Sequence, residues 1–214
     1  MSSIGDRRTA AQKDGTAAYQ LRRKEITDAA IQVFNKVGFK QASIGAVAEQ
    51  LGTDRASLYY YISSKEELFD EIVREVVREN VAISQRIQKS DASAGDKLHE
   101  LIRAVMVSYG KHYPLMFIYI RENLSHVSKN RLKWAQQMRK LNRDFEKSVI
   151  EIIEEGYADG SFRNAGPAEI VAYGIIGMFN STHRWFRPGR TSSSAEDIGR
   201  IYADLNLAGL LQRP

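Results

Sequence analysis

The chain has 214 residues, of which 43% are hydrophobic and 27% are charged, a balance that suits a globular protein with its own core. No uninterrupted apolar run reaches the roughly 20 residues of a membrane span, and the N-terminus lacks the apolar stretch of a secretory signal. The absence of cysteine excludes disulfides, thiolate metal sites and a catalytic thiol, and it favours a cytoplasmic location. The net charge of +5 is by itself a weak indication of nucleic-acid binding.

Basic residues are concentrated at the N-terminus, where only Asp6 and Asp14 oppose them. A flexible basic arm over residues 1–18, followed by a helix, is suited to attract phosphate groups. A solvated tail without a partner would have the same composition. The basic residues that precede residue 25 are Arg7, Arg8, Lys13, Arg22, Arg23 and Lys24.

Apolar residues at helical spacing predict helices through nearly the whole chain. In the first third, Gly38 and Gly52 supply C-terminal stops, and Ser43 is a suitable N-cap between them. Ser63 and Ser64 each precede a glutamate by three positions, so either could open a capping box. Four helices are therefore expected, over residues 22–38, 43–51, 54–61 and 63–88.

Longer helices are expected in the rest of the chain. Pro114 and Pro188 stand just past two of their ends, and Pro167 suits the first turn of another. Ser193, followed by Glu196, predicts a capping box for the last helix. Because there is no strand pattern, an all-α protein of about nine helices is predicted. The later helices are expected over residues 94–112, 115–123, 129–157, 167–187 and 193–211.

The two short helices joined at Gly52 form a helix-turn-helix pattern, in which the N-terminal residues of the second helix enter the major groove. Leu58 would then face the core, and Arg55 and Ser57 would face outward. An arginine there can donate two hydrogen bonds to guanine, worth roughly 1–3 kcal/mol of base discrimination. Lys65 opens the next helix, where its ammonium and the free amides would both attract a phosphate.

Three consecutive tyrosines, Tyr59, Tyr60 and Tyr61, end the second short helix and cannot all face one core. A phenol offers a hydroxyl to a phosphate and a flat face to a thymine methyl group. Taken singly, each of these tyrosines is more often a core or boundary residue, and a lone lysine is more often solvated. The glycine, the caps, the tyrosines and the lysine in one window together indicate DNA binding.

Residues 22–69, and above all GTDRASLYYYISSKEELF, resemble the N-terminal DNA-binding domain of the TetR family of transcriptional regulators. The segment AAIQVFNKVGFKQASIGAVAEQLG is similar to the family's first two helices. Gly45 stands where some members carry a base-reading side chain, so Arg55 is expected to do more of the reading. The resemblance implies that Ser43 meets a phosphate, that Arg55, Ala56, Ser57 and Tyr59 face bases, and that Tyr60, Tyr61 and Lys65 meet the DNA backbone.

Small residues form a narrow stripe on the helix that begins at Pro167. Glycine inside a helix costs roughly 1 kcal/mol relative to alanine, so two glycines on one face suggest that another helix approaches closely. This helix and the last one, from each of two subunits, would form a four-helix interface, as the resemblance also implies. Packing of both stripes within one subunit is the alternative. The homodimer interface is predicted to contain Gly174, Gly177, Ser181, Ile201, Leu205 and Ala208.

The segment YPLMFIYIRENL is apolar nearly all round, which suits either a core or a chamber for a small, largely apolar effector. The ending HRWFRPGRTSSSAEDIGRIY resembles the C-terminal domain of a TetR branch of actinobacteria and related bacteria, in which several regulators respond to acyl-CoA thioesters. That resemblance implies that an arginine such as Arg184 pairs with CoA phosphates. The effector site is predicted to include Met116, Tyr119, Trp134, Met138, Asn180 and Arg184.

An enzyme is not expected, because the four histidines are scattered and the chain has neither an H-E-x-x-H nor a G-x-S-x-G motif. No catalytic residue, metal or cofactor is therefore predicted. The expected protein is a ligand-responsive regulator that binds a palindromic operator in double-stranded DNA as a homodimer and most often represses. An effector-independent or architectural DNA-binding protein and an activator remain as alternatives. The expected domains are residues 1–18 (arm), 19–66 (DNA binding) and 67–214 (ligand binding and dimerisation).

Overall fold

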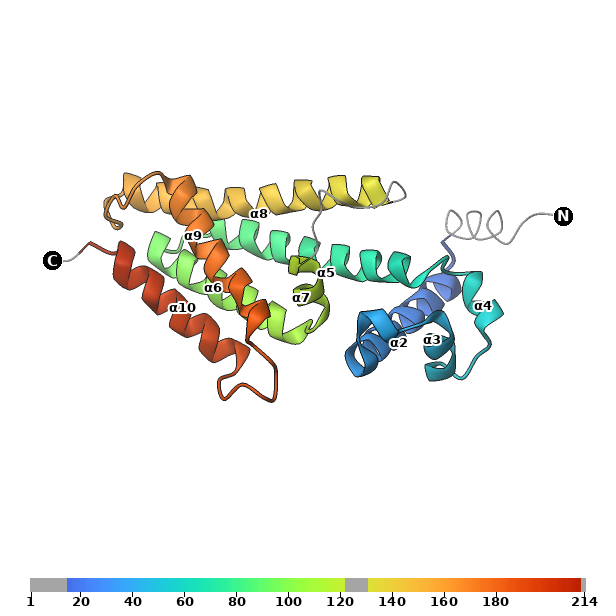
Figure 1. Cartoon of the computed structure of the whole chain (residues 1–214). Helices are drawn as coiled ribbons and strands as arrows, with labels where there is room; N and C mark the ends of the chain where they lie inside the picture. Colours follow the sequence, from blue (N-terminus) through green and yellow to red (C-terminus); the bar gives the residue numbers. More distant parts are fainter. Residues whose placement is uncertain (1–14, 122–130, 213–214) are drawn as a thin grey trace. The chain divides into compact units, whose positions relative to one another are not determined.

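A computed structural model describes residues 15–121 and 131–212. Within these residues the chain forms nine α-helices and one short 3-10 helix and contains no β-strand, which confirms the all-α prediction (Figure 1). None of the described helices is both long and apolar enough to cross a membrane. The helices separate into two compact units, one ending at Val73 and the other beginning at Arg74. The sequence-based domain limits at 18/19 and 66/67 stay predictions, and most of the expected arm lies outside the described residues.

The first unit contains α2 (Ala17–Gln41), α3 (Ile44–Gln50), α4 (Arg55–Tyr59) and the first turns of α5 (Lys65–Gln88). The helix α2 begins earlier than predicted, because the side chain of Thr16 accepts a hydrogen bond from the Tyr19 amide. The expected stop at Gly38 is instead a kink with φ of 78°, beyond which one more turn forms.

Apolar stripes of these four helices meet in one core. Phe39 lies between two other aromatic rings, with ring centroids 5.5 Å from Phe34 and 4.7 Å from Phe69. Full burial of a side chain such as Phe34 stabilises the fold by about 1.5–3 kcal/mol, so this core fixes which face of each helix points outward. Side chains that are fully buried here are Ile26, Phe34, Val47, Leu58 and Ile62.

The second unit contains the end of α5 and all later helices. Two boundaries differ from the prediction. The helix expected over residues 167–187 ends earlier, because a 3-10 turn follows α9, and the cap of the last helix is Ser194 with Asp197 rather than Ser193 with Glu196. The expected helix ends at 122–123 and 129–130 lie outside the described residues. The elements are α6 (Ala94–Lys111), α7 (Leu115–Arg121), α8 (Leu132–Ala158), α9 (Ala168–Asn180), η2 (Ser181–Arg184) and α10 (Ala195–Leu210).

Helices α6 and α10 approach each other closely at two glycines. A Cβ atom on Gly110 would lie 2.5 Å from the Cβ of Ala195, and one on Gly199 would lie 3.0 Å from the Cα of Arg103. At Gly174 and Gly177 of α9, by contrast, an added Cβ would meet nothing within 4 Å. The close helix contact inside the subunit is therefore made by glycines other than those singled out in the sequence.

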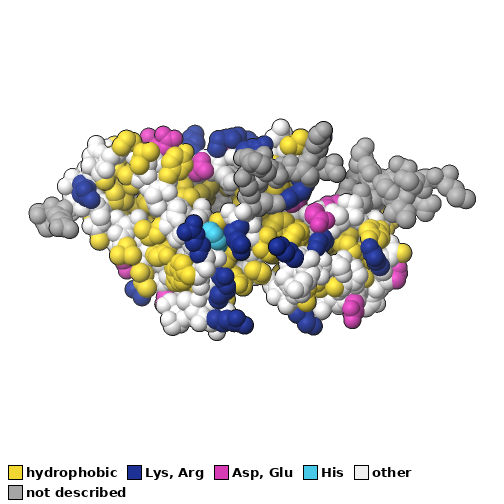
Figure 2. Space-filling view, viewed as in Figure 1, with side chains coloured by type: hydrophobic (Ala, Val, Ile, Leu, Met, Phe, Trp, Pro, Cys, Tyr) yellow, Lys and Arg dark blue, Asp and Glu magenta, His cyan; other side chains and the backbone are white. Residues whose placement is uncertain are grey.

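An apolar surface on α9 and α10 is left exposed in the described chain. Ile170 and Leu205 are 64% and 59% exposed, values unusual for large aliphatic side chains, and Tyr173 and Ile201 are also exposed. Figure 2 shows hydrophobic side chains gathered over these two helices, which face the viewer in Figure 1.

Candidate nucleic-acid interface and ligand cavities

Helices α3 and α4, joined by a turn at Gly52, expose the side chains that were expected to read DNA. Leu58 is fully buried, which leaves the first turn of α4 directed outward, so that Arg55, Ala56 and Ser57 are exposed. Gly52 has φ of 64°, a left-handed conformation that glycine adopts without a steric penalty. Ser43, also exposed, caps α3 by accepting a hydrogen bond from the Ala46 amide at 3.1 Å.

Arg55 and Tyr59 form one unit on the exposed face of α4. The Nε and Nη2 atoms of Arg55 donate to the Tyr59 hydroxyl oxygen at 3.0 and 2.6 Å. A guanidinium carries five N–H donors, so three remain for a base edge or a phosphate. Because the arginine is held along one edge, its guanidinium has a fixed orientation in the free protein.

The start of α4 is fixed by its own cap. The Asp54 carboxylate accepts hydrogen bonds from the Ser57 amide, at 2.9 Å, and from the Ser57 hydroxyl. These bonds hold the pKa of Asp54 below its usual range. The serine predicted to face bases thus also closes the first turn of α4.

The end of α4 is fixed by aromatic contacts. Tyr61 packs against Tyr19 of α2 and against Tyr60, with ring centroids 5.1 and 5.0 Å apart. Tyr60 remains 36% exposed, and Tyr61 is half-buried. The sequence analysis did not single out Tyr19, because this residue directly follows the segment assigned to the flexible arm.

Lys65 has a structural role that the sequence analysis did not predict. Its Nζ atom donates to the carbonyl oxygens of Phe39, Lys40 and Ala42 at 3.0–3.1 Å. A lysine ammonium has three N–H donors, so all three are used inside the protein rather than offered to a phosphate. The kink at Gly38 turns these carbonyls, at the negative end of α2, toward the start of α5.

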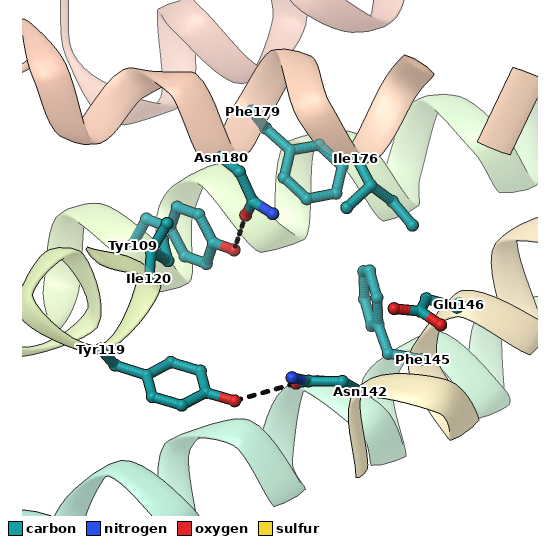
Figure 3. Close-up of a pocket in the computed structure, with 9 residues that line it drawn as sticks. All are labelled: Tyr109, Tyr119, Ile120, Asn142, Phe145, Glu146, Ile176, Phe179 and Asn180. Atoms are coloured by element: carbon teal, nitrogen blue, oxygen red, sulfur yellow. Dashed lines mark hydrogen bonds between the residues drawn. The ribbon is translucent and has the colours of Figure 1, made fainter. Parts of the chain in front are cut away.

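A cavity of about 180 Å³ lies between α6, α7, α8 and α9 (Figure 3). Two tyrosine–asparagine pairs line it: the Tyr109 hydroxyl donates to Asn180 Oδ1 at 2.8 Å, and the Tyr119 hydroxyl donates to Asn142 Oδ1 at 3.0 Å. A smaller cavity of about 60 Å³ shares Tyr109, Tyr119 and Asn142 with the first. The remaining residues of the larger cavity are Ile120, Phe145, Glu146, Ile176 and Phe179.

Glu146 brings a carboxylate to the edge of this cavity. Burial raises its pKa, an effect that the charge of Arg143 opposes and the charge of Glu169 reinforces. Burial likewise raises the pKa of the Tyr109 phenol, which therefore stays a neutral hydrogen-bond donor. The cavity thus combines aromatic walls with amide, hydroxyl and carboxyl groups.

The predicted effector residues do not all lie together. Tyr119 and Asn180 line the larger cavity, and Met116 lines the smaller one. Trp134 and Met138 are buried but line neither of these two cavities. Arg184 lies in η2, where its side chain is exposed, and it lines neither of the two cavities.

Two domain families match the chain. The family described as "Bacterial regulatory proteins, tetR family" matches residues 26–72, and "Tetracyclin repressor-like, C-terminal domain" matches residues 91–210. The chain belongs to the TetR family. The resemblance seen in the sequence is thus confirmed, and the protein is a transcriptional regulator rather than an enzyme. In the part of the chain that the structure describes, no group of His, Asp or Glu side chains is placed to hold a metal ion.

Several TetR-family relatives cover nearly the whole chain. The "HTH-type transcriptional repressor KstR2" of Mycolicibacterium smegmatis is 28% identical over 191 residues, which are 89% of this chain and 91% of the relative. The structure of the ketosteroid transcriptional regulator KstR2 of Mycobacterium tuberculosis has a TM-score of 0.76 at 26% identity and covers 90% of this chain and 96% of its own. FadR from Bacillus subtilis in complex with stearoyl-CoA has the same fold, with a TM-score of 0.68 at 18% identity over 87% and 98% of the two chains.

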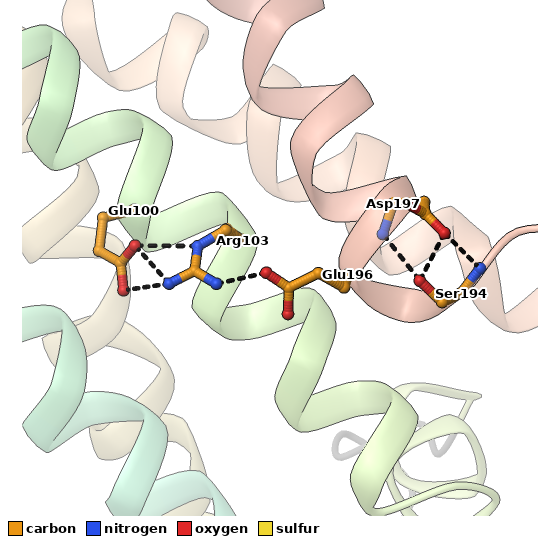
Figure 4. A network of polar contacts seen from close by, with 5 residues as sticks. All are labelled: Glu100, Arg103, Ser194, Glu196 and Asp197. Atoms are coloured by element: carbon orange, nitrogen blue, oxygen red, sulfur yellow. Dashed lines mark hydrogen bonds and ion pairs between the residues drawn. The ribbon is translucent and has the colours of Figure 1, made fainter.

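In this TetR-family chain, α10 is anchored to α6 at its N-terminal end (Figure 4). The Arg103 guanidinium of α6 donates to Glu100 on its own helix, at 2.8–3.1 Å, and to Glu196 of α10. Beside it, Ser194 and Asp197 form a reciprocal capping box. With one face of α10 held against α6, Ile201 and Leu205 are left on the exposed side.

The role of Lys65 gives a prediction about stability. Replacing it with methionine should lower the free energy of unfolding by about 1–3 kcal/mol, because three carbonyl oxygens lose a charged donor. Urea unfolding of the full chain, followed by circular dichroism, measures this change. Lys40→Met removes the same charge from an exposed side chain, and its free energy of unfolding should stay within about 0.5 kcal/mol of that of the unchanged protein. Equal stability of both variants would contradict the assigned role.

Proposed function

We propose that this TetR-family protein represses transcription by binding a palindromic operator as a homodimer, and that a small effector releases it. The observation that carries the proposal is the first turn of α4, where Arg55, Ala56 and Ser57 are exposed above the buried Leu58. This turn is the part of a helix-turn-helix that enters the major groove. The repressor names of the KstR2 relatives support the direction of regulation.

The proposed DNA contacts come from the start of α3 and from both ends of α4. Ser43 would meet a phosphate at the start of α3, and the tyrosines at the end of α4 would meet the backbone through their hydroxyls. Lys65 is left out of these contacts, because its donors are occupied by carbonyls. Base contacts are assigned to Arg55, Ala56, Ser57 and Tyr59, and backbone contacts to Ser43, Tyr60 and Tyr61.

A dimer is proposed because one recognition helix of five residues presents few base-reading side chains. Two such heads can contact half-sites about 34–36 Å apart on one side of the duplex. The exposed apolar face of α9 and α10 supports this pairing, since large apolar side chains there would be covered by the same face of a second copy. Its centre would contain the open Gly174 and Gly177, with Ser181, Ile201, Leu205 and Ala208 around them.

The effector is proposed to bind at the cavity between α6, α7, α8 and α9. Its 180 Å³ is below the roughly 300–1,000 Å³ of typical ligand sites, so a ligand must displace the side chains that separate it from the smaller cavity. The stearoyl-CoA complex of a protein with the same fold supports acyl-CoA thioesters as the first class to test. The exposed Arg184 would then pair with CoA phosphates at the surface.

Release from DNA requires that the effector bind one arrangement of the dimer better than the other. An operator fixes the spacing of the two recognition helices, and a ligand that favours another spacing competes with it. To change the dimer from 99% to 1% operator-competent, the effector must favour the second arrangement about 10,000-fold.

Arg55→Ala should remove discrimination at one base pair of each half-site, at a cost of about 1–3 kcal/mol, because it removes the bidentate donor to guanine. Affinity for random duplex DNA at the same salt concentration should change much less. The measurement is fluorescence anisotropy with operator, single-base variants and random duplexes. Arg86→Ala, which removes an exposed positive charge from the far end of α5, is the control. Equal losses on all duplexes would exclude Arg55 as a base reader.

Gly177→Leu should convert the dimer to monomers, because a leucine would fill the space in which the two copies of α9 meet. Light scattering coupled to size exclusion measures the mass. Ala82→Leu adds the same side chain at an exposed position of α5 and should leave the dimer intact. A dimeric Gly177→Leu variant would place the interface elsewhere.

A thermal-shift screen tests the effector. A ligand that binds only the native state raises the free energy of unfolding by RT ln(1 + [L]/Kd), about 2.7 kcal/mol at a hundredfold excess over Kd. Acyl-CoA thioesters, with free CoA and the matching free acids as controls, should raise the melting temperature and release the operator in the same concentration range. A compound that stabilises the protein without releasing the operator would contradict its role as effector.

A further inference from the structure

One buried guanidinium connects three elements of the DNA-binding unit. Arg23 of α2 is 9% exposed and donates through Nη1 to the backbone carbonyl of Tyr61, just past the end of α4. Its Nη2 atom forms an ion pair with Glu71 of α5, and its Nη1 atom lies 3.9 Å from a carboxylate oxygen of Glu67. Arg23 therefore touches the end of the recognition helix and the first two turns of α5 at the same time.

The partners of Arg23 are themselves held in place. The second carboxylate oxygen of Glu67 accepts a hydrogen bond from the Ser63 amide at 2.7 Å, and the Glu67 amide donates to the Ser64 hydroxyl at 3.1 Å. The turn between α4 and α5 is thus fixed from both sides. The ring of Tyr61 adds a contact to α2 through Tyr19.

The planar guanidinium of arginine suits position 23, whereas the single ammonium group of a lysine would not. Arginine can direct separate N–H groups at a carbonyl and at a carboxylate in fixed directions, and lysine cannot do both with the same geometry. A buried ion pair often contributes little net stability compared with apolar packing, so a role in fixing geometry accounts better for this arginine. No described contact of Arg23 is directed at the exposed face of α4.

We propose that Arg23 is a positioning residue for operator binding: with Glu71 it sets the orientation of α4, and hence the register of Arg55 in the major groove. This inference rests on the proposed operator binding.

The test uses Glu71→Gln in the full chain, with Glu75→Gln as the matched control. Glu75 lies one turn farther along α5 and forms an exposed pair with Arg78. Removing a negative charge from a DNA-binding protein should by electrostatics alone strengthen DNA binding, and Glu75→Gln should do no more than that. Glu71→Gln should instead weaken operator binding about tenfold, the equivalent of one charged hydrogen bond, while its random-duplex affinity should match that of Glu75→Gln.

Arg23→Lys and Arg23→Gln complete the series, with circular dichroism to confirm that each variant is folded at the temperature used. Both should lose operator affinity, and Arg23→Lys should keep random-duplex affinity, since lysine keeps the charge but not the fork. Arg23→Gln also removes a positive charge, so a small loss on random duplexes is expected for it alone. Operator affinity unchanged in the folded Glu71→Gln protein, or a loss shared equally by random DNA, would overturn the positioning role. Failure of the unchanged protein to prefer any palindrome would instead refute the proposed function, so the two failures are distinguishable.

Discussion

Helix α4 is five residues long, and a helix of that length does not persist in water without support from its surroundings. The rest of the DNA-binding unit supplies that support. Burial of Leu58 fixes the inner face of α4, the Asp54 cap fixes its start, and the carbonyl of Tyr61 is held by Arg23 at its end. The exposed face that carries Arg55 is therefore a consequence of the packing behind it, and the proposed DNA recognition would depend on that packing.

The second unit combines one closely packed pair of helices with small internal cavities. The contact between α6 and α10 is tight, since an added Cβ would lie 2.5 Å from the Cβ of Ala195 at Gly110 and 3.0 Å from the Cα of Arg103 at Gly199. Between α6, α7, α8 and α9, by contrast, two tyrosine–asparagine hydrogen bonds separate small cavities. Each such bond contributes about 0.5–1.5 kcal/mol, an amount that a ligand offering its own polar groups can replace. The cavities between α6, α7, α8 and α9 thus adjoin the closely packed pair of α6 and α10.

Local features of the fold could be predicted from the sequence because they depend on neighbouring residues. The cap at Ser43, the turn at Gly52 and the burial of Leu58 all follow from short-range patterns. Boundaries were less certain where several caps compete, as in the run of serines before α10, where Ser194 rather than its neighbour accepts the amide.

Features that depend on distant residues could not be predicted. Lys65 binds carbonyls that lie 23–26 positions away in the sequence, and nothing in its own segment indicates this. Arg23 was counted only as part of a basic N-terminus, although its partners Glu67 and Glu71 lie on α5. Trp134 and Met138 have the apolar character of cavity residues, yet both are packed in the core, since chemical type does not specify which buried side chains border a void.

The central claim is that two α3–α4 heads of a dimer recognise a symmetric DNA site. Selection of binding sites from a pool of random-sequence duplexes, followed by sequencing, tests it most directly. We expect an enriched palindrome whose half-site centres are separated by a whole number of helical turns, about 34–36 Å each. Enrichment of a single unpaired motif, or no enrichment above the starting pool, would contradict it.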